Sequence, residues 1–447
     1  MIARFALSAC VVCGLFTANA QTKTFPFTYK EADLDNGLRL VTIPTDAPNL
    51  VSVYIVVQTG SRNEIEPGKT GFAHLFEHMM FRGTEKYPAE RYNEVLQKAG
   101  AASNAYTSDD VTVYHTTFSK EDLPEILSME ADRFQNLKWT PDTIRTEAGA
   151  VLGEYNKNSS DPTRKMDEVL RNTAYDRHTY KHTTMGFEAD VRDMPNQFDY
   201  SQKFFDRYYR PEYTTLVVAG DIDPAAVRAL VDKSWASWKR GSYHPDIPAE
   251  PPQQGARTAH IDWPQSTLPM LTIAFRAPAY SDSSKDAAAL SMLGRLAFSP
   301  TSALYQKLVV TEQKLDGLSA SFGHRVDPSL FRVSARIKNV SDMEYVQSEI
   351  QKTLNGLREN LLPEAQLNAA KSRERYAFPL ELTNSDSVAD SVAEFIGLAR
   401  TTGTIDKYYA VLGSLTPEDL RNTARKYFVE SGRTTVTLTG PAAGGKK

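Results

Sequence analysis

Two histidines and a glutamate stand close together in one apolar segment. They form the run His74-Leu75-Phe76-Glu77-His78, in a chain that has only eight histidines. On a helix, residues four apart lie on the same face, so both imidazoles can reach one metal ion with Glu77 beside them. The order H-x-x-E-H is the inverted form of the zinc-protease motif. It indicates a metal ion, a general base and hydrolysis.

A zinc hydrolase usually has three protein ligands and leaves the fourth position for water. We expect the third ligand to come from another element, so that it approaches from a different side. A helix predicted to begin at Pro141 offers two candidates, Glu147 and Glu154. They lie seven residues apart, which is two helical turns, so both side chains face the same way. The spacing alone does not choose between them.

With these two glutamates, the sequence resembles the M16 family of zinc metallopeptidases, which includes pitrilysin, insulysin and mitochondrial processing peptidase. The family carries His-x-x-Glu-His and, at a matching distance, a ligating glutamate that another glutamate precedes by seven positions; here Glu154 follows His78 by 76 residues. The resemblance implies one zinc ion per chain, bound by His74, His78 and Glu154. It also implies that Glu77 is the general base toward a zinc-activated water, and that Glu147 orients a ligating histidine.

Residues 104–115 look like the strand that lies beside the metal in this family. There it is an edge strand, to which a peptide substrate adds by backbone pairing. The resemblance implies that Asn104 contacts the substrate backbone and that Ala105 contributes main-chain groups. A plain sheet strand with Asn104 in a turn is the alternative. His115 is expected to be structural, because the set of three ligands is already complete.

The second half departs from the family pattern. Active members usually supply an Arg and a Tyr from this half to stabilise the oxyanion, but the corresponding positions here are Val309 and Ala320. Arg325 could substitute only through an unusual loop. The resemblance therefore implies a heterodimer, in which a homologous subunit that lacks the zinc motif brings the Arg and Tyr. The alternatives are a non-catalytic structural or peptide-binding subunit, and a self-sufficient homodimeric peptidase.

The surrounding elements indicate an α+β fold with two homologous domains, each an antiparallel sheet packed with helices. A Pro-rich stretch at residues 244–255 divides two halves that are weak repeats of each other. We expect domains at residues 21–240 and 258–440, a linker at 241–257 and a flexible tail at 441–447. In the first domain, the patterns predict helices over 71–81 and 119–137, a strand over 103–118, and a helix beginning at Pro141.

The N-terminus and the composition point to an exported protein. Residues 1–20 look like a cleavable signal peptide ending in Ala18-Asn19-Ala20, with a buried first helix or a lipoprotein box at Cys10 as the alternatives. Both cysteines, Cys10 and Cys13, lie in this segment, so the mature chain would have neither disulfides nor thiolate zinc ligands. We expect a periplasmic protein without a membrane span. The net charge of −4 argues against a nucleic-acid partner. The family resemblance implies that the substrates are peptides.

Overall fold

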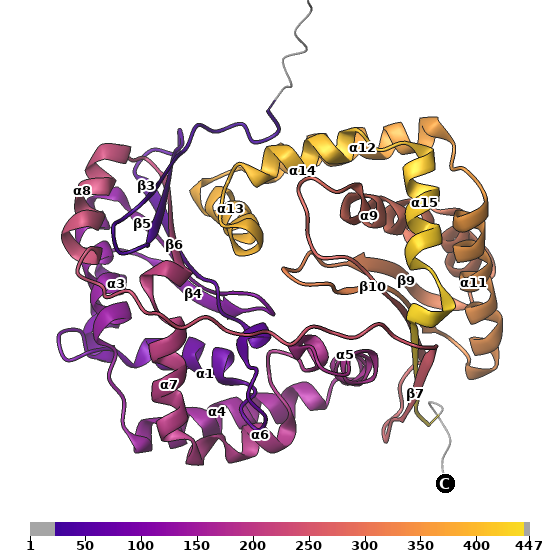
Figure 1. The fold of residues 1–447 in the computed structure, drawn as a ribbon, viewed down its shortest axis with the longest axis horizontal. Coiled ribbons are helices and arrows are strands. Elements are labelled where there is room, and N and C mark those ends of the chain that lie inside the picture. Colours follow the sequence, from indigo (N-terminus) through magenta and orange to yellow (C-terminus); the bar gives the residue numbers. More distant parts are fainter. Residues whose placement is uncertain (1–22, 442–447) are drawn as a thin grey trace, which may run out of the picture.

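The protein has two domains, each built on one β-sheet with helices packed against it (Figure 1). The computed structural model describes residues 23–441, so the predicted signal peptide and nearly all of the predicted tail lie outside the described residues. The first sheet has six strands in the order β1-β2-β6-β3-β5-β4. Its strands are β1 (Lys30–Asp33), β2 (Arg39–Pro44), β3 (Leu50–Val57), β4 (Ala102–Thr107), β5 (Thr112–Ser119) and β6 (Thr214–Gly220).

The second sheet repeats this arrangement without the outermost strand. It has five strands in the order β7-β11-β8-β10-β9. These are β7 (Arg257–Asp262), β8 (Met270–Arg276), β9 (Leu315–Phe322), β10 (Leu330–Ile337) and β11 (Arg433–Thr439). The paired Thr-Thr segments of the sequence repeat occupy matching strands, β6 and β11. The strand order thus follows the repeat seen in the sequence.

The predicted α+β class with two domains is confirmed, and each sheet is mainly antiparallel. Each sheet also contains one parallel pair, β2 with β6 and β7 with β11. In both cases the last strand of the domain returns beside the first or second strand after a long connection. Such a connection can cross over the sheet and enter it in the parallel sense, whereas a short hairpin cannot.

Helices of the first domain cover one face of the first sheet and form the largest hydrophobic core with it. The most deeply buried of them is α1, which carries the H-x-x-E-H motif. The helices are α1 (Phe72–Met79), α2 (Ala89–Lys98), α3 (Leu123–Asn136), α4 (Pro141–Ser159), α5 (Pro162–Ala174), α6 (Glu188–Asp193), α7 (Phe198–Tyr208) and α8 (Pro224–Trp235).

Helices of the second domain pack in the same way against the outer face of the second sheet. A π-helix at Gln306–Thr311 directly follows the short helix α10. The helices are α9 (Lys285–Phe298), α10 (Ala303–Tyr305), α11 (Met343–Glu359), α12 (Glu364–Glu381), α13 (Ser385–Ala399), α14 (Thr404–Gly413) and α15 (Pro417–Tyr427).

One helix of each domain packs against the sheet of the other domain. α13 from the second half packs on β3 and β6, while α5 from the first half packs on β7 and β11, as Figure 1 shows. The central strands of the two sheets are therefore covered on both faces. This explains why β6 reads as the continuous apolar run Leu-Val-Val-Ala with every residue buried, although alternation is the usual pattern when one face meets water.

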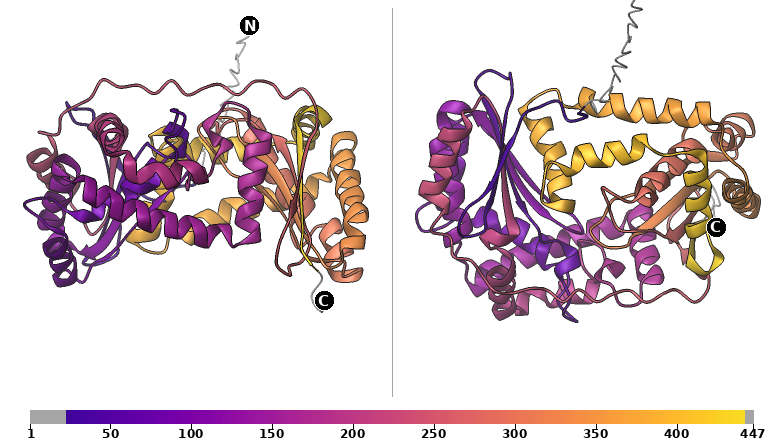
Figure 2. Two further views of the ribbon diagram at one scale, coloured as in Figure 1. Left: turned by 90° about the horizontal axis from the view of Figure 1, so that it is seen from below. Right: turned by 45° about the horizontal axis from the view of Figure 1, so that its top comes forward.

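An extended connection between α8 and β7 joins the halves along one side of the molecule (Figure 2). It contains no helix or strand, in keeping with its prolines. Glu250 ties it down by accepting the backbone N–H groups of Asp176, Arg177 and His178, and by pairing with Arg276. The residue boundaries predicted for the domains and the linker stay a prediction.

The predicted elements of the first domain need two corrections. The single strand expected over residues 103–118 is a hairpin, β4 and β5, because Ser108 and the two aspartates that follow it form a tight turn. The helix expected from residue 119 begins as a 3₁₀ turn, and the α-helix starts only at Leu123. The helix predicted from Pro141 is confirmed as α4, with Thr140 accepting the N–H of Thr143 as its cap.

Candidate metal centre

α1 presents its polar residues to the site because its apolar residues hold it in the core. Four of them, Phe72, Leu75, Phe76 and Met79, are fully buried. The buried hydroxyl of Tyr114 also donates a hydrogen bond to the carbonyl of Phe76, at 3.2 Å. With that side packed, Glu77 and His78 remain half-buried at the surface of the helix. The helix therefore has little freedom to rotate.

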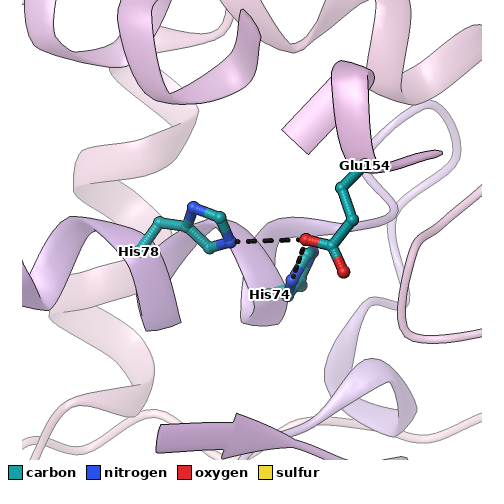
Figure 3. Close-up of side chains that lie close together, drawn as sticks. All are labelled: His74, His78 and Glu154. Carbon is teal, nitrogen blue, oxygen red and sulfur yellow. Dashed lines mark ion pairs between the residues drawn. The ribbon is translucent and has the colours of Figure 1, made fainter. Parts of the chain in front are cut away.

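His74, His78 and Glu154 converge from α1 and α4 (Figure 3). One ligand atom from each lies within 4.8 Å of the other two. The Glu154 carboxylate oxygen is 3.4 Å from His74 Nε2 and 3.7 Å from His78 Nε2. Two ligands about 2.0–2.1 Å from a tetrahedral zinc ion are about 3.4 Å apart. The three side chains therefore fit a zinc ion, and two imidazoles with one carboxylate form a donor set that zinc accepts.

For His78 and Glu154, the surrounding groups favour the protonation states that a metal requires. Burial and the neighbouring His74 lower the pKa of His78, which favours the neutral imidazole. The hydrogen bond and charge of His74 lower the pKa of Glu154 to about 2, so its carboxylate is ionised at neutral pH. The Nδ1 atom of His74 is buried and has no hydrogen-bond partner among the described residues.

Glu147 lies behind His78, on the side away from Glu154. Its side chain is only 2% exposed, and one of its oxygens is 3.8 Å from His78 Nδ1. Its other oxygen forms an ion pair with Arg82, which sequence reasoning missed. The signal was present, because Arg82 follows His78 by four residues and so lies near it in space. Glu147 thus contacts the imidazole of His78 through the nitrogen that faces away from Glu154.

Glu77 is held by a residue from the sheet. The hydroxyl of Thr107, at the end of β4, donates a 2.6 Å hydrogen bond to a Glu77 carboxylate oxygen. This contact fixes the carboxylate next to His78 on the same helix. Sequence reasoning missed Thr107 as well, since nothing in the spacing of residues 77 and 107 links a helix to the end of a strand.

β4 is the edge strand of the first sheet, and it packs beside α1. Asn104 is exposed and pairs with His115 of β5, while Ala105 is buried on the opposite face, toward the core that contains α1. Alternation along the strand places Thr107 on the same face as Ala105. The Asn104 side chain therefore lies on the sheet face opposite to Glu77. His115 stacks on Tyr54 with ring centroids 4.8 Å apart, a structural contact.

The second domain has apolar residues at the two positions where the family pattern expects an Arg and a Tyr. Val309 lies in the π-helix and Ala320 lies on β9, the edge strand of the second sheet. Arg325, the possible substitute, forms an ion pair with Asp109, with 2.6 Å between Nε and Oδ2. Asp109 also pairs with Arg171. The guanidinium of Arg325 therefore joins the two halves.

Two family models match the chain, and together they span most of it. Residues 39–188 match "Insulinase (Peptidase family M16)" and residues 197–374 match "Peptidase M16 inactive domain". The first range contains α1 and α4 with all of the converging side chains. Among the helices of the described residues, none combines the length and apolarity needed to cross a membrane.

Relatives and solved structures agree with this match. A zinc protease PqqE from Helicobacter pylori is 29% identical, over 94% of this chain and 95% of that protein. The crystal structure of a protease from Helicobacter pylori superimposes with a TM-score of 0.86 at 28% identity, covering 92% of this chain and 99% of that one. The first half of the periplasmic protease PqqL from Escherichia coli shares the fold, with a TM-score of 0.72 at 19% identity over 92% of each chain.

Proposed function

Because the chain belongs to the M16 peptidase family, we propose that it is a zinc-dependent endopeptidase subunit that hydrolyses peptides or unfolded segments. One observation carries the proposal. His74, His78 and Glu154 come from two helices and bring their ligand atoms within 4.8 Å of one another, with Glu77 on the same helix. A structural helix pair has no need of this combination of side chains.

The roles of the residues follow from their positions. His74, His78 and Glu154 would hold a zinc ion, which when bound would supply Lewis-acid chemistry toward water and the peptide carbonyl. Glu77 accepts the proton of the attacking water and passes it to the leaving amine. The hydroxyl of Thr107 keeps the Glu77 carboxylate aimed at that water. Glu147 fixes the ring of His78.

The substrate would bind along β4. An edge strand offers unpaired backbone groups, to which an extended peptide can add as another strand. β4 ends at Thr107, which contacts the base, so a peptide paired with this strand is led toward Glu77. Ala105 would contribute main-chain groups and Asn104 a side-chain contact. Backbone pairing of this kind favours unfolded segments over folded proteins.

A second, homologous subunit would complete the site. Val309 and Ala320 stand at the positions of the expected Arg and Tyr, and Arg325 is engaged with Asp109. We expect the partner to lack the zinc motif and to carry the Arg and Tyr that stabilise the oxyanion. The signal-like residues 1–20 support export of this chain to the periplasm, and the Escherichia coli relative PqqL is described as a periplasmic protease.

The decisive experiment measures metal and hydrolysis in the same samples. Purified protein should contain about one zinc per chain. Glu77→Gln should keep the zinc and reduce hydrolysis of a quenched-fluorescent peptide by roughly 10²–10⁴-fold. Glu85→Gln is the matched control, because Glu85 is exposed and pairs only with Lys138 at the surface. It should change neither quantity.

Two other outcomes would change the proposed function. Zinc binding without hydrolysis, with or without the homologous subunit, would favour a structural or peptide-binding role. Full hydrolysis by the chain alone would show that no second subunit is needed. The proposed zinc-dependent mechanism would still stand. An increase in hydrolysis when the homologous subunit is added to this chain would support the complete proposal.

A further inference from the structure

The metal-binding helix begins without a capping side chain of its own. The residue before it, Gly71, has a left-handed backbone with φ +90° and offers no side chain. The first N–H groups of any helix have no partner inside the helix, so another group must satisfy them when they are buried. Here they lie in the core of the first domain, next to the metal ligand His74.

Glu64 supplies that missing cap from the preceding loop. One carboxylate oxygen accepts the N–H of Gly71 and the other accepts the N–H of Ala73, both at 2.8 Å. The side chain is completely buried. Burial raises the pKa of Glu64 to about 8, and the N–H groups of Ala73 and Gly71 oppose that rise, so the contact with α1 is a hydrogen-bonding one. Glu64 thus binds the start of α1 through the N–H groups of Gly71 and Ala73. Ala73 directly precedes His74 in the sequence.

Two contacts surround Glu64 and the loop that carries it. The Nδ1 of buried His182 lies 3.6 Å from one Glu64 oxygen and donates a 2.9 Å hydrogen bond to the carbonyl of Thr183. On the other side, the hydroxyl of Tyr208 donates to the carbonyl of Asn63, at 2.8 Å. The packing of its loop therefore sets the position of the Glu64 carboxyl group. This group in turn sets the position of the first turn of α1.

We propose that Glu64 is a positioning residue, which fixes the start of α1 and thereby the placement of His74 and Glu77 relative to Glu154. The inference rests on the proposed function and deepens it. α1 has only two turns, and His74 is its third residue, so a shift of the first turn moves this ligand directly. Metal and catalytic sites tolerate displacements of only about 0.5 Å.

A purely structural role for Glu64 predicts different results. A buried carboxylate that only stabilises the fold would, when changed, lower the unfolding temperature and leave the folded fraction with normal zinc affinity and turnover. A positioning residue must change the site in protein that is still folded. Zinc affinity, turnover at saturating zinc, and the unfolding temperature therefore have to be measured on the same variant.

The test variant is Glu64→Gln, which keeps the shape of the side chain. The amide oxygen can accept one N–H, but the amide nitrogen then faces the second N–H as donor against donor. We expect zinc affinity, measured by chelator competition, to fall roughly 10- to 100-fold. At saturating zinc, kcat should fall while KM for the peptide stays nearly unchanged.

The control is Glu66→Gln in the same loop. Glu66 is partly exposed, and its side chain interacts with Arg207 and Tyr200 and forms no hydrogen bond with an N–H group of α1 among the described contacts, so zinc affinity and kcat should stay at the wild-type values. Glu64→Asp serves as a second variant if Glu64→Gln does not fold, because it keeps the carboxyl group but is too short to reach both N–H groups. Wild-type zinc affinity and kcat in a folded variant at Glu64 would overturn the proposal.

A measurement on the metal-free protein separates this inference from the proposed function. If Glu64 holds the first turn of α1 in place, replacing Glu64 should speed the hydrogen exchange of the Gly71 and Ala73 amides. Glu66→Gln should leave the exchange rate of these amides unchanged. Unchanged exchange at these amides would overturn the inference even if the wild type proves to be a zinc peptidase. Absence of zinc binding and hydrolysis in the wild type would instead defeat the proposed function, and the exchange data would still decide whether Glu64 holds α1.

Discussion

Glu147 illustrates how much of the site depends on residues that do not touch the metal. It is almost fully buried between His78 and Arg82, and a buried carboxylate is costly unless it is paired. Arg82 supplies the opposite charge, and it is itself half-exposed. Together the three side chains link the solvent to His78, which we propose to be a metal ligand. The carboxylate restricts the ring of His78, and the guanidinium restricts the carboxylate.

Replacing Glu147 should therefore weaken metal binding without unfolding the protein. We expect Glu147→Gln to reduce zinc affinity roughly 10- to 100-fold, as is usual for groups that orient a ligating histidine. Arg82→Gln should act in the same direction but less strongly, since it works through Glu147. Chelator competition measures both. Zinc affinity in Glu147→Gln equal to that of the wild type would show that packing of α1 alone orients His78.

The sequence was sufficient to find the three residues that converge, but it did not reveal the residues that hold α1 and Glu77 in place. His74, His78 and Glu154 were predicted from helical spacing and the resemblance, and the structure brings their side chains together. Thr107 and Glu64 were missed, because their contacts with α1 depend on where a strand end and a loop lie in three dimensions. Helical periodicity relates residues on one helix, and it carries no information about such contacts.

At the scale of elements, the close fit of α13 on the first sheet depends on one glycine. A side-chain carbon added at Gly397 would lie 2.9 Å from a methyl carbon of Val111, which is nearer than such atoms normally approach. Val111 is β-branched and stiff, so it cannot easily move away. The absence of a side chain at residue 397 lets the helix reach the sheet.

We therefore expect Gly397→Ala to destabilise the protein. Overpacking costs about 1–3 kcal/mol, which outweighs the roughly 0.5–1 kcal/mol that alanine contributes inside a helix. Gly356→Ala in α11 is the matched control, because a side chain there meets open space. It should leave the free energy of unfolding unchanged or raise it. Urea unfolding compares the two, and a Gly397→Ala variant as stable as the wild type would disprove the close fit.

The exchange of α5 and α13 between the domains could not be read from the sequence. The repeat and the Pro-rich connection predicted two α+β domains, and that architecture is confirmed. The apolar faces of these two helices show only that each must be buried, and they do not say against which sheet. The apolar strands β3 and β6 have the same limit, because their continuous apolar runs indicate coverage on both faces but do not say which helix provides it.

At the scale of the whole molecule, a group of charged and polar side chains, some buried and some partly exposed, joins the halves. Asp327 from the second domain pairs with Arg62 and with His178 from the first, at 2.5 and 3.0 Å. Next to it, the hydroxyl of Tyr180 donates a 2.6 Å hydrogen bond to Asp110, which also accepts the N–H of Val326. Arg62 lies two residues before Glu64, so contact between the halves supports the loop that caps α1.

This junction should make the stability of the protein sensitive to acid. Burial alone would raise the pKa of Asp327, but the hydrogen bonds and charges of His178 and Arg62 outweigh burial and lower it from 3.8 to about 2. Because the folded-state pKa is the lower one, the stabilisation is fully present above pH 3.8 and is lost as the pH falls from about 4 to about 2. The lowering corresponds to about 2 kcal/mol.

Asp327→Asn removes this contribution and tests it. At pH 7, the free energy of unfolding should fall by about 2 kcal/mol, and the difference from the wild type should shrink as the pH falls from 4 toward 2. Asp316→Asn is the control, since Asp316 forms only an exposed pair with Arg336 and should change stability by less than about 0.5 kcal/mol. Urea unfolding of metal-free protein at several pH values measures both. A difference between Asp327→Asn and the wild type that stays constant down to pH 2 would show that Asp327 contributes by packing, and that its charge does not join the two halves.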